Sequence, residues 1–373
     1  MSHKRILVVE PYYGGSHQQF IEGLIDNVPA EYTILSLPAR KWKMRMQLSA
    51  PWFVRQIDEM EISERFFDAV LFSTFIDVAV FKALIVSVKN WNHSCKYLLY
   101  FHENQFSYPG ILPKKSNHQF TAINFTAALV ADFVAFNSHF NRINFLAQCR
   151  DYTRKAIDMD VGVEVDRIEK KSVTLYPGID FKELDRLSVL EKNDHNPLII
   201  WNHRWEHDKN PEEFFEILSR LQEEGIGFRL AVLGQSFSRQ PACFDDAKKI
   251  FDKNIIHFGY IEDRIAYYKL LVQGNIVVST ALHEFYGIAV LEAVRAGCVP
   301  VLPARLSYQE LFDGAYLYED GMLFEHLKEL LCCKPSLSLS TSRNLTDRYS
   351  WHSLTEQYRC WLGLRKVTSG TEQ

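Results

Sequence analysis

The stretch that most constrains the fold of this chain is residues 279–300, which read STALHEFYGIAVLEAVRAGCVP. The pattern predicts the end of a strand, a loop, a helix, a turn and a second buried strand, an arrangement typical of an α/β sheet. Gly287 should allow close backbone approach and place helix N–H groups where a phosphate could bind. Gly297 should end the helix. The stripe of this helix that faces the core is expected to contain Ile288, Leu291 and Val294.

Two carboxylates accompany this helix: Glu284 lies just before it and Glu292 lies inside it. If the helical spiral is extended back to Glu284, the two side chains lie on roughly the same side, about 12 Å apart along the axis. That separation suits a long polar ligand with hydroxyl groups at both ends, such as a nucleotide sugar. The alternative is that both carboxylates line a solvated edge of the helix.

A second junction of strand, loop and helix begins at residues 198–201, LIIW. Asn210 is the expected N-cap of the following helix, and Pro211 suits its first position. Arg204 and Lys209 flank this junction. Two fixed cations beside a helix N-terminus can form a diphosphate site, so we expect this loop to bind the phosphates of a nucleotide.

The first half of the chain opens with a similar junction. Residues 5–10, RILVVE, form a short apolar run that is typical of a parallel strand covered on both faces. Gly14 and Gly15 should make the turn that follows, and Ser16 should cap the first helix. Such a turn is a common approach point for a phosphate or a sugar, although two glycines also make ordinary tight turns.

Four polar residues follow the strand predicted at residues 96–101: His102, Glu103, Asn104 and Gln105. Open α/β sheets place ligands at the carboxyl ends of their strands, and packing alone explains such residues poorly. Metal binding is the rival interpretation, but His102 and Glu103 lack a second spaced pair of ligands. His203 and His207 flank Glu206 outside any helical pattern. We therefore predict no metal site.

Cations and one tryptophan gather after the strand predicted at residues 32–37: Arg40, Lys41, Trp42, Lys43 and Arg45. Cations suit a nucleic-acid backbone, and an aromatic ring suits an unstacked base. The alternative is a solvated loop whose tryptophan packs on the domain. Either interpretation expects a loop here.

The length of 373 residues indicates two domains. A net charge of −4 argues against a general polyanion binder, so any contact with nucleic acid must come from local patches. Seven scattered cysteines without a C-x-x-C pair predict reduced thiols in a cytosolic protein. The N-terminal residues predict no signal peptide, and Asp77 and Lys82 interrupt the apolar residues 69–88, which argues against a membrane span.

The predicted domains are residues 1–185 and residues 195–345, followed by a closing helical segment at residues 346–373. The turn LYPGID at residues 175–180 ends the first half. The charged residues 184–196, which end in Asn-Asp-His-Asn-Pro, indicate a linker.

The pattern S-T-x-x-H-E-F-Y-G-x-x-x-L-E-A-x-x-A-G-C-x-P within residues 279–300 resembles the E-x7-E signature of retaining family 4 glycosyltransferases. The resemblance implies the α/β GT-B fold, in which two Rossmann-like domains face each other across a cleft and a closing helix crosses back to the first domain. It implies that Glu284 contacts the donor sugar, that Glu292 contacts the ribose, and that Arg204 and Lys209 bind the diphosphate. The further donor-binding residues that it implies are Gly14, Gly15, Gly259, Tyr260, Ile261, Phe285, Tyr286, Gly287 and Ile288.

The blocks EPYYGGSH, LPARKWKMRM, FHENQFSYP and NSHFNR, which lie within residues 5–145, resemble the tRNA-queuosine mannosyltransferase family. The resemblance implies transfer of mannose from GDP-mannose to a cyclopentene hydroxyl of queuosine, at the wobble position of an aspartate tRNA. We expect a bacterial, cytoplasmic member without cofactor, metal ion, membrane contact or obligate protein partner. His102 would lie near the anomeric centre. The residues expected to contact the tRNA acceptor are Ser16, His17, Arg40, Lys41, Trp42, Lys43, Arg45, Glu103, Asn104 and Gln105.

Two other functions stay open at this point. One is a family 4 glycosyltransferase with another nucleotide-sugar donor and a lipid or small-molecule acceptor, which predicts an amphipathic basic helix in the N-terminal domain. The other is a non-catalytic nucleic-acid-binding protein on a GT-B scaffold. The intact set Arg204, Lys209, Glu284 and Glu292 argues against that second alternative.

Overall fold

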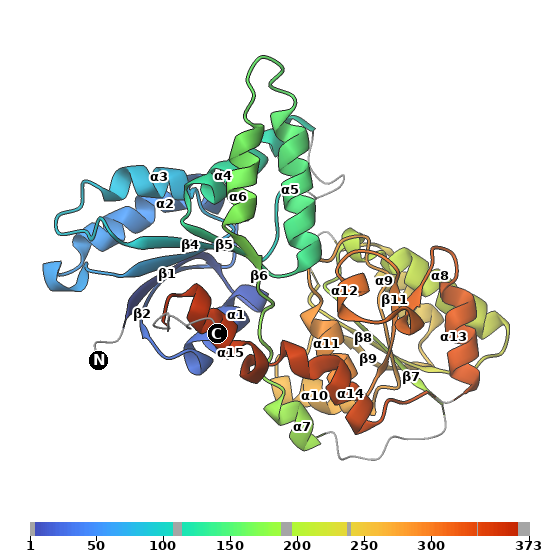
Figure 1. Ribbon diagram of the computed structural model, residues 1–373. Coiled ribbons are helices and arrows are strands. Elements are labelled where there is room, and N and C mark those ends of the chain that lie inside the picture. Colours follow the sequence, from blue (N-terminus) through green and yellow to red (C-terminus); the bar gives the residue numbers. More distant parts are fainter. Residues whose placement is uncertain (1–3, 107–113, 188–195, 237–239, 334, 365–373) are drawn as a thin grey trace, which may run out of the picture. The chain divides into compact units, whose positions relative to one another are not determined.

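A computed structural model describes residues 4–106, 114–187, 196–236, 240–333 and 335–364. The chain divides into two compact units (Figure 1). Unit 1 comprises Met1–Gly178 and Trp351–Gln373, and unit 2 comprises Ile179–Ser350. The boundaries predicted from the sequence were residues 185–195 and residue 346, whereas the units divide between residues 178 and 179 and between residues 350 and 351.

Unit 1 is built on a sheet of six parallel strands in the order β2-β1-β3-β4-β5-β6. The strands are β1 (Arg5–Tyr13), β2 (Glu31–Pro38), β3 (Ala69–Ser73), β4 (Lys96–Phe101), β5 (Phe133–Phe136) and β6 (Ser172–Thr174). The direction of strand order reverses between β1 and β3, and open α/β sheets bind ligands at such a switch point. The predictions of β1 to β5 are confirmed. The short β6 follows a charged region and is missed.

Helices cover both faces of this sheet (Figure 1). One face carries α1 (Gly15–Asn27) and α15 (Trp351–Trp361). The other carries α2 (Trp42–Glu59), α3 (Val78–Ile85), α4 (Lys114–Val130), α5 (His139–Thr153) and α6 (Gly162–Lys170). Along β1, Ile6 and Val8 pack toward the first face while Leu7 and Val9 pack toward the second. Because alternate residues of a strand point to opposite faces, a strand covered on both sides must be apolar throughout.

The helix α15 packs against α1 through Trp351. A Cβ atom on Gly23 would lie 2.2 Å from Trp351 Nε1, and one on Gly178 would lie 2.3 Å from Trp351 Cδ2. Atoms cannot approach that closely, so the buried indole requires glycine at both positions. The last helix of the described chain is therefore part of the core of unit 1.

Unit 2 is a second sheet of six parallel strands, in the order β12-β11-β10-β7-β8-β9. The strands are β7 (Leu198–Asn202), β8 (Arg229–Leu233), β9 (Ile255–Gly259), β10 (Ile276–Val278), β11 (Val299–Pro303) and β12 (Leu317–Tyr318). This is the strand order of dinucleotide-binding folds, with the switch point between β7 and β10.

One face of this sheet is covered by α8 (Pro211–Glu223), α9 (Cys243–Ile250) and α13 (Leu323–Cys332). The other carries α10 (Arg264–Gln273) and α11 (Ile288–Arg295) (Figure 1). The other α-helices described in unit 2 are α7 (Lys182–Leu187), α12 (Tyr308–Leu311) and α14 (Leu339–Thr346). The predicted ends of α8 and α11 are confirmed: Asn210 and Gly287 are the N-caps, Pro211 begins α8, and Gly297 follows α11 with a φ of 93°.

Two local predictions in unit 1 are wrong. Ser16 lies inside α1, whose N-cap is Gly14, because the helix begins at Gly15 with a φ of 55°. Residues 42–45 belong to the first turn of α2 and do not form a loop. Lys41 caps that helix in the left-handed conformation, with a φ of 52°.

Candidate active site

The two predicted donor motifs of unit 2 meet at one ion pair. Lys209 Nζ lies 3.2 Å from Glu284 Oε2 and donates to the His283 carbonyl oxygen at 2.5 Å. Asp208 Oδ2 lies 3.3 Å from the same Nζ. The backbone carbonyl of Asp208 accepts hydrogen bonds from Leu282 N at 2.8 Å and His283 N at 3.2 Å. The loops that follow β7 and β10 are thus tied together at the switch point of the sheet.

The carboxylate of Glu284 is held in one orientation. Its Oε1 accepts from Phe285 N at 3.1 Å and from Tyr286 N at 3.5 Å. Burial would raise the pKa of Glu284, but the adjacent Lys209 ammonium and other nearby positive charge, including Arg204, outweigh it and lower the pKa to about 2. Glu284 is therefore an ionised, fixed acceptor at any pH at which the protein works.

Two histidines beside this ion pair are buried and neutral. Burial and the nearby Lys209 lower the pKa values of both His203 and His283 to about 4. A glycine is required opposite His203: a Cβ atom on Gly234 would lie 1.8 Å from the His203 carbonyl oxygen. The close approach of these two loops therefore depends on Gly234.

Arg204 and the N-terminus of α11 supply further positive potential near Glu284. Arg204 is half exposed and its Nη2 lies 3.1 Å from Glu206 Oε2. Gly287 caps α11 with a φ of 112°, and it makes no side-chain cap hydrogen bond. The first N–H groups of a helix carry partial positive charge, which suits an anionic ligand. The predicted cations and helix start are thus parts of one region of unit 2.

Glu292 lies inside α11 and is only 6% exposed. Its Oε1 accepts from Arg264 Nη2 at 3.1 Å and from Tyr268 OH at 3.2 Å. Glu292 therefore does not line a solvated helix edge, because its carboxylate is buried against the Arg264 cation. Sequence reasoning missed Arg264, which begins α10. Of the predicted donor-binding residues, Gly259 ends the edge strand β9, and Tyr260 and Ile261 follow it.

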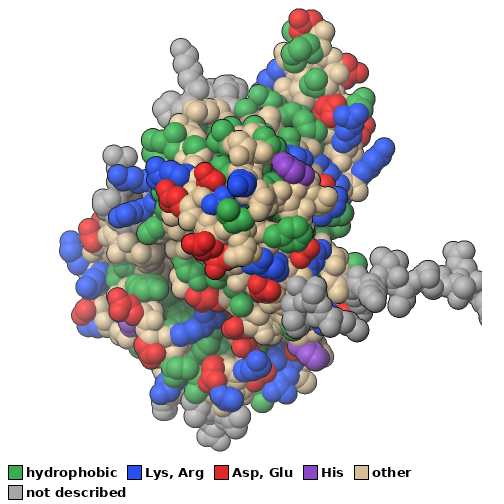
Figure 2. Space-filling view, turned by 90° about the vertical axis from the view of Figure 1, so that its left-hand side faces the viewer, with side chains coloured by type: hydrophobic (Ala, Val, Ile, Leu, Met, Phe, Trp, Pro, Cys, Tyr) green, Lys and Arg blue, Asp and Glu red, His purple; other side chains and the backbone are tan. Residues whose placement is uncertain are grey.

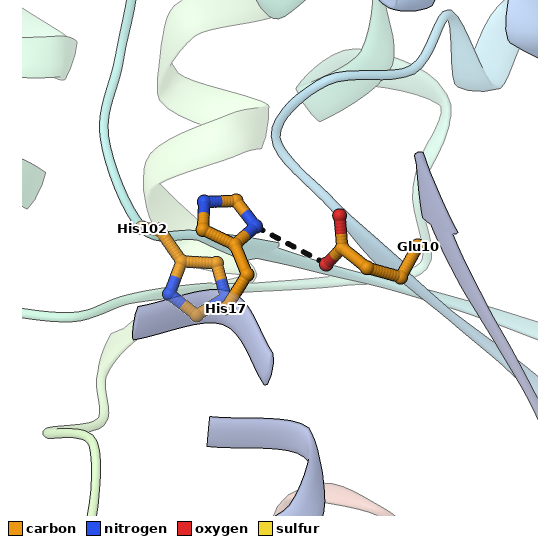
Figure 3. Close-up of side chains that lie close together, drawn as sticks. All are labelled: Glu10, His17 and His102. Carbon is orange, nitrogen blue, oxygen red and sulfur yellow. Dashed lines mark hydrogen bonds and ion pairs between the residues drawn. The ribbon is translucent and has the colours of Figure 1, made fainter. Parts of the chain in front are cut away.

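Unit 1 contains a cluster of titratable groups at its own switch point, formed by Glu10, His17 and His102 (Figure 3). His17 Nδ1 lies 3.2 Å from Glu10 Oε2, and the rings of His17 and His102 lie with their centroids 4.0 Å apart. On its other side, His17 Nε2 lies 3.4 Å from Glu103 Oε2. Ser73 Oγ, at the end of β3, donates to Glu10 Oε1 at 2.9 Å. The predicted residues His17, His102 and Glu103 are therefore brought together.

Glu10 is the member of this cluster that sequence reasoning missed. It is fully buried, and its Oε1 also accepts from Tyr12 N at 2.7 Å. A signal was present, because a charged residue closes the apolar run of the first strand at the edge where ligands bind.

The two histidines of the cluster differ in protonation. Burial opposes protonation of His17, but the Glu10 and Glu103 carboxylates outweigh burial and raise its pKa to about 10. Burial and the charge of His17 lower the pKa of His102 well below its ordinary value. At neutral pH one ring is therefore an imidazolium and the other a neutral imidazole.

Glu10, His17 and His102 each offer one ligand atom, and these atoms lie within 4.8 Å of one another. They are the donor types that zinc uses. However, each ring nitrogen of His17 faces a carboxylate, which favours a proton on both nitrogens. A doubly protonated ring has no lone pair for a metal ion. The arrangement therefore fits a buried imidazolium better than a metal centre.

Buried amides hold the loop after β4 in place. Asn137 Nδ2 donates to the His102 carbonyl oxygen at 2.6 Å. Asn104, which is fully buried, donates from Nδ2 to Asn141 Oδ1 at 2.8 Å. The backbone N–H of Gln105 donates to Asn124 Oδ1 at 2.9 Å. Asn104, predicted to contact the acceptor, thus has a structural contact within unit 1.

Aromatic side chains connect the predicted basic stretch, residues 40–45, to the cluster around His17. Trp42 packs on Phe75 at 5.7 Å and on Phe120 at 5.1 Å between ring centroids, and Phe75 stacks on His17 at 5.4 Å. Trp42 is therefore part of unit 1's packing, as the alternative interpretation expected. Lys41 and Lys43 are exposed at the start of α2.

The alternative with a lipid acceptor predicts a basic helix in the N-terminal domain, and residues 42–45, predicted as a loop, are helical. No helix within the described residues is both long enough and apolar enough to cross a membrane. Figure 2 shows cationic and anionic side chains interspersed over one face of the molecule. Binding of a polyanion on that face would need a local group of cations.

The predicted glycine turn of unit 1 lies in close contact with a neighbouring segment. A Cβ atom on Gly14 would lie 2.6 Å from Ala39 Cβ. The turn after β1 therefore packs directly on the segment that leads into α2. Glycine serves this packing whether or not the turn also approaches a ligand.

Two family models match this chain, one for each unit. Residues 5–179 match the family model described as tRNA-queuosine alpha-mannosyltransferase N-terminal, and residues 185–327 match glycosyl transferases group 1. A tRNA-queuosine alpha-mannosyltransferase of Drosophila melanogaster is 35% identical over 321 residues, which are 84% of this chain and 83% of that protein.

Solved structures show the same architecture. Sucrose-phosphate synthase from Thermosynechococcus elongatus has a TM-score of 0.69 at 12% identity, over 97% of this chain and 100% of its own. HepE from Anabaena, crystallised with UDP and glucose, has a TM-score of 0.65 at 13% identity, over 97% and 100%. With the two parallel sheets, these likenesses confirm the α/β GT-B fold. By its sequence matches, the chain belongs to the tRNA-queuosine alpha-mannosyltransferase family and is a hexosyltransferase.

Proposed function

We propose that the protein transfers mannose from GDP-mannose to queuosine at the wobble position of an aspartate tRNA, with retention of anomeric configuration and without a metal ion. Family membership supports the acceptor and the sugar. The observation that carries the donor chemistry is the ion pair between Lys209 and Glu284, which joins the two donor motifs of unit 2.

In this proposal Lys209 and Arg204 stabilise the departing diphosphate. Transfer of a sugar passes through an oxocarbenium-like state while negative charge grows on the leaving group. Preorganised cations act most strongly where charge develops in the transition state. Lys209 is 5% exposed, so water screens it little. The N-terminus of α11 adds partial positive charge at Gly287.

The carboxylates hold the two ends of the donor. Glu284 would accept hydrogen bonds from hydroxyl groups of mannose, because it is ionised and fixed by two backbone N–H groups. Glu292 would accept hydrogen bonds from the ribose hydroxyls, oriented by Arg264 and Tyr268. Gly259, Tyr260 and Ile261 would contact the guanine.

In unit 1, the neutral ring of His102 would lie near the anomeric carbon and orient the sugar. We assign no general base, because the leaving phosphate itself can take the proton of the acceptor hydroxyl. The exposed cations at the start of α2 would contact the anticodon arm of the tRNA. The protein would work in the cytoplasm, where its tRNA substrate and nucleotide sugar occur.

The test is transfer in the presence of EDTA. The purified protein is mixed with queuosine-containing tRNA and GDP-mannose, and the nucleosides of the tRNA are read by mass. Addition of one hexose to queuosine supports donor, acceptor and metal independence together. Binding of GDP-mannose without transfer would remove the proposed acceptor, and transfer that EDTA abolishes would contradict metal independence.

A further inference from the structure

The cluster around His17 leaves one carboxylate without a balancing charge. His17 faces acceptor oxygens on both sides, so both ring nitrogens carry hydrogen and the ring is a cation. Glu10 is fully buried and lies closer to His17, at 3.2 Å, than Glu103 does, at 3.4 Å. With both carboxylates ionised, this group of three carries a net charge of −1.

The excess charge belongs to Glu103. Glu10 also accepts hydrogen bonds from Ser73 Oγ and Tyr12 N, so its two oxygens have three partners. Glu103 has the single contact to His17 among the contacts described, and its side chain is 14% exposed. It follows β4 directly, at the edge of the sheet where ligands bind. A carboxylate in this position can bind a cation that arrives with a ligand.

Two neighbours of Glu103 also offer polar atoms for a ligand. His102 Nε2 and Gln105 Oε1 are buried and have no hydrogen-bond partner among the described residues. His102 is 6% exposed and Gln105 is 1% exposed. Buried polar atoms without a partner are costly, and a ligand that pairs with them removes this cost. Figure 3 shows the His102 ring within the cluster.

Queuosine carries a cation of the required kind. A secondary aliphatic amine joins its deazaguanine methylene to the cyclopentene ring that bears the hydroxyl groups. Such an amine is protonated near neutral pH, and it has two N–H donors. It lies on the same small ring as the hydroxyl that receives the sugar, so a residue that fixes the amine also fixes that hydroxyl.

From these observations we infer that Glu103, held beside the Glu10–His17 pair, binds the protonated secondary amine of queuosine and so sets which hydroxyl meets the donor. The inference rests on the proposed function. Gln105 Oε1 offers an acceptor for the second N–H. The cluster then recognises queuosine by its charge, a property that guanine at the same position lacks.

The experiment compares three tRNAs that differ only at the wobble base. One carries aminomethyl-deazaguanine, which has the amine without the cyclopentene ring. The second carries the neutral hydroxymethyl analogue, and the third carries guanine. Equilibrium binding is measured in the presence of GDP. The wild-type protein should bind the amine-bearing tRNA about tenfold more tightly than the other two, because a partly buried charge pair contributes more than an exposed one.

Two charge-removing variants sharpen this comparison. In Glu103→Gln the preference for the amine-bearing tRNA over the other two tRNAs should fall to about one. Glu61→Gln is the matched control, because Glu61 is exposed and precedes β3, at the opposite end of the strands. It should keep the full preference. Retention of the preference in Glu103→Gln would overturn the inference.

Wild-type measurements keep the inference testable if the variant does not fold. Equal wild-type affinity for the amine and hydroxymethyl tRNAs would overturn it, even if mannose transfer to queuosine is observed and the proposed function stands. Failure of transfer with GDP-mannose, together with equal binding of all three tRNAs, would overturn both the inference and the proposed function. Stoichiometric zinc in the dialysed wild-type protein that is absent from Glu10→Gln would also overturn it, because a metal ion would then hold His17.

Discussion

At each of the two switch points a carboxylate faces a cation, but the two cations are of different kinds. In unit 2 the partly buried carboxylate Glu284 faces Lys209. In unit 1 the buried carboxylate Glu10 faces a histidine, which is a cation only because two carboxylates hold its proton. The first site offers the Lys209 and Arg204 cations to a leaving diphosphate. The second has excess negative charge suited to a cationic acceptor.

Removal of the Lys209 cation should have the largest effect. In Lys209→Met, kcat/KM for mannose transfer should fall by about 10³-fold, because a preorganised charge at the leaving group is lost. The variant also leaves Glu284 and Asp208 without their buried cation. The measurement is single-turnover transfer to queuosine tRNA. Lys328→Met, which removes an exposed lysine paired with Glu224, is the control and should stay near the wild-type rate. A loss as small as that of the control would contradict the assignment of Lys209 to the leaving diphosphate.

The partner carboxylate should show a smaller loss. Glu284→Gln keeps the shape of the side chain and removes the charge that holds Lys209, so transfer should fall by about 10²-fold. Steady-state rates at saturating GDP-mannose measure this change. Thermal unfolding of the same variant separates a loss of fold from a loss of chemistry. An unchanged rate would mean that Lys209 needs no partner here and that Glu284 does not touch the sugar.

The ribose end of the donor site should affect binding more than rate. Arg264→Ala leaves Glu292 buried without its cation, so KM for GDP-mannose should rise about tenfold while kcat changes little. Arg264→Lys keeps the charge and should recover part of the affinity. A fall in kcat with unchanged KM would place Arg264 near the reacting atoms and contradict the division between the two ends of the donor.

The contrast between lysine and histidine should also appear in stability. The folded pKa of His17, about 10, lies above its ordinary value of 6.5. Its contribution to stability is therefore complete below pH 6.5 and is lost as pH rises toward 10. The difference in melting temperature between pH 6.5 and pH 10 should be smaller in His17→Gln than in the wild type, by roughly 5 °C.

Calorimetry on both proteins measures that difference. Burial raises the pKa of Cys95, which also weakens the fold at high pH, so only the comparison with the variant isolates His17. Equal differences in the two proteins would show that His17 is not a cation in the folded state. That result would remove the basis for the excess charge at Glu103.

The sequence could predict most of unit 2 because its signals are local. The apolar runs, Pro211, Gly287 and Gly297 each act within a few residues, and the motif resemblance assigned both Lys209 and Glu284 to the donor site. Arg264 carried no such signal, since its role depends on α10 packing beside α11. Contacts of that kind arise only when distant segments fold together.

The site of unit 1 was harder to predict from the sequence, because its four residues come from two distant segments. Glu10 and His17 lie in the first junction, whereas His102 and Glu103 follow β4. The loop prediction at the start of α2 is wrong for a different reason. The cations and Trp42 are typical of a loop, whereas the helical spacing of Met46, Ala50 and Phe53 indicates a helix. All three of those side chains are buried on one face of the helix.

The most direct test of the account separates donor chemistry from acceptor placement in one preparation. Hydrolysis of GDP-mannose without tRNA and transfer to queuosine tRNA are measured for the wild type, Lys209→Met and Glu103→Gln. We predict that Lys209→Met loses both reactions, while Glu103→Gln keeps hydrolysis and loses most of the transfer. Equal loss of both reactions in the two variants would contradict the claim that unit 2 activates the donor and unit 1 places the acceptor.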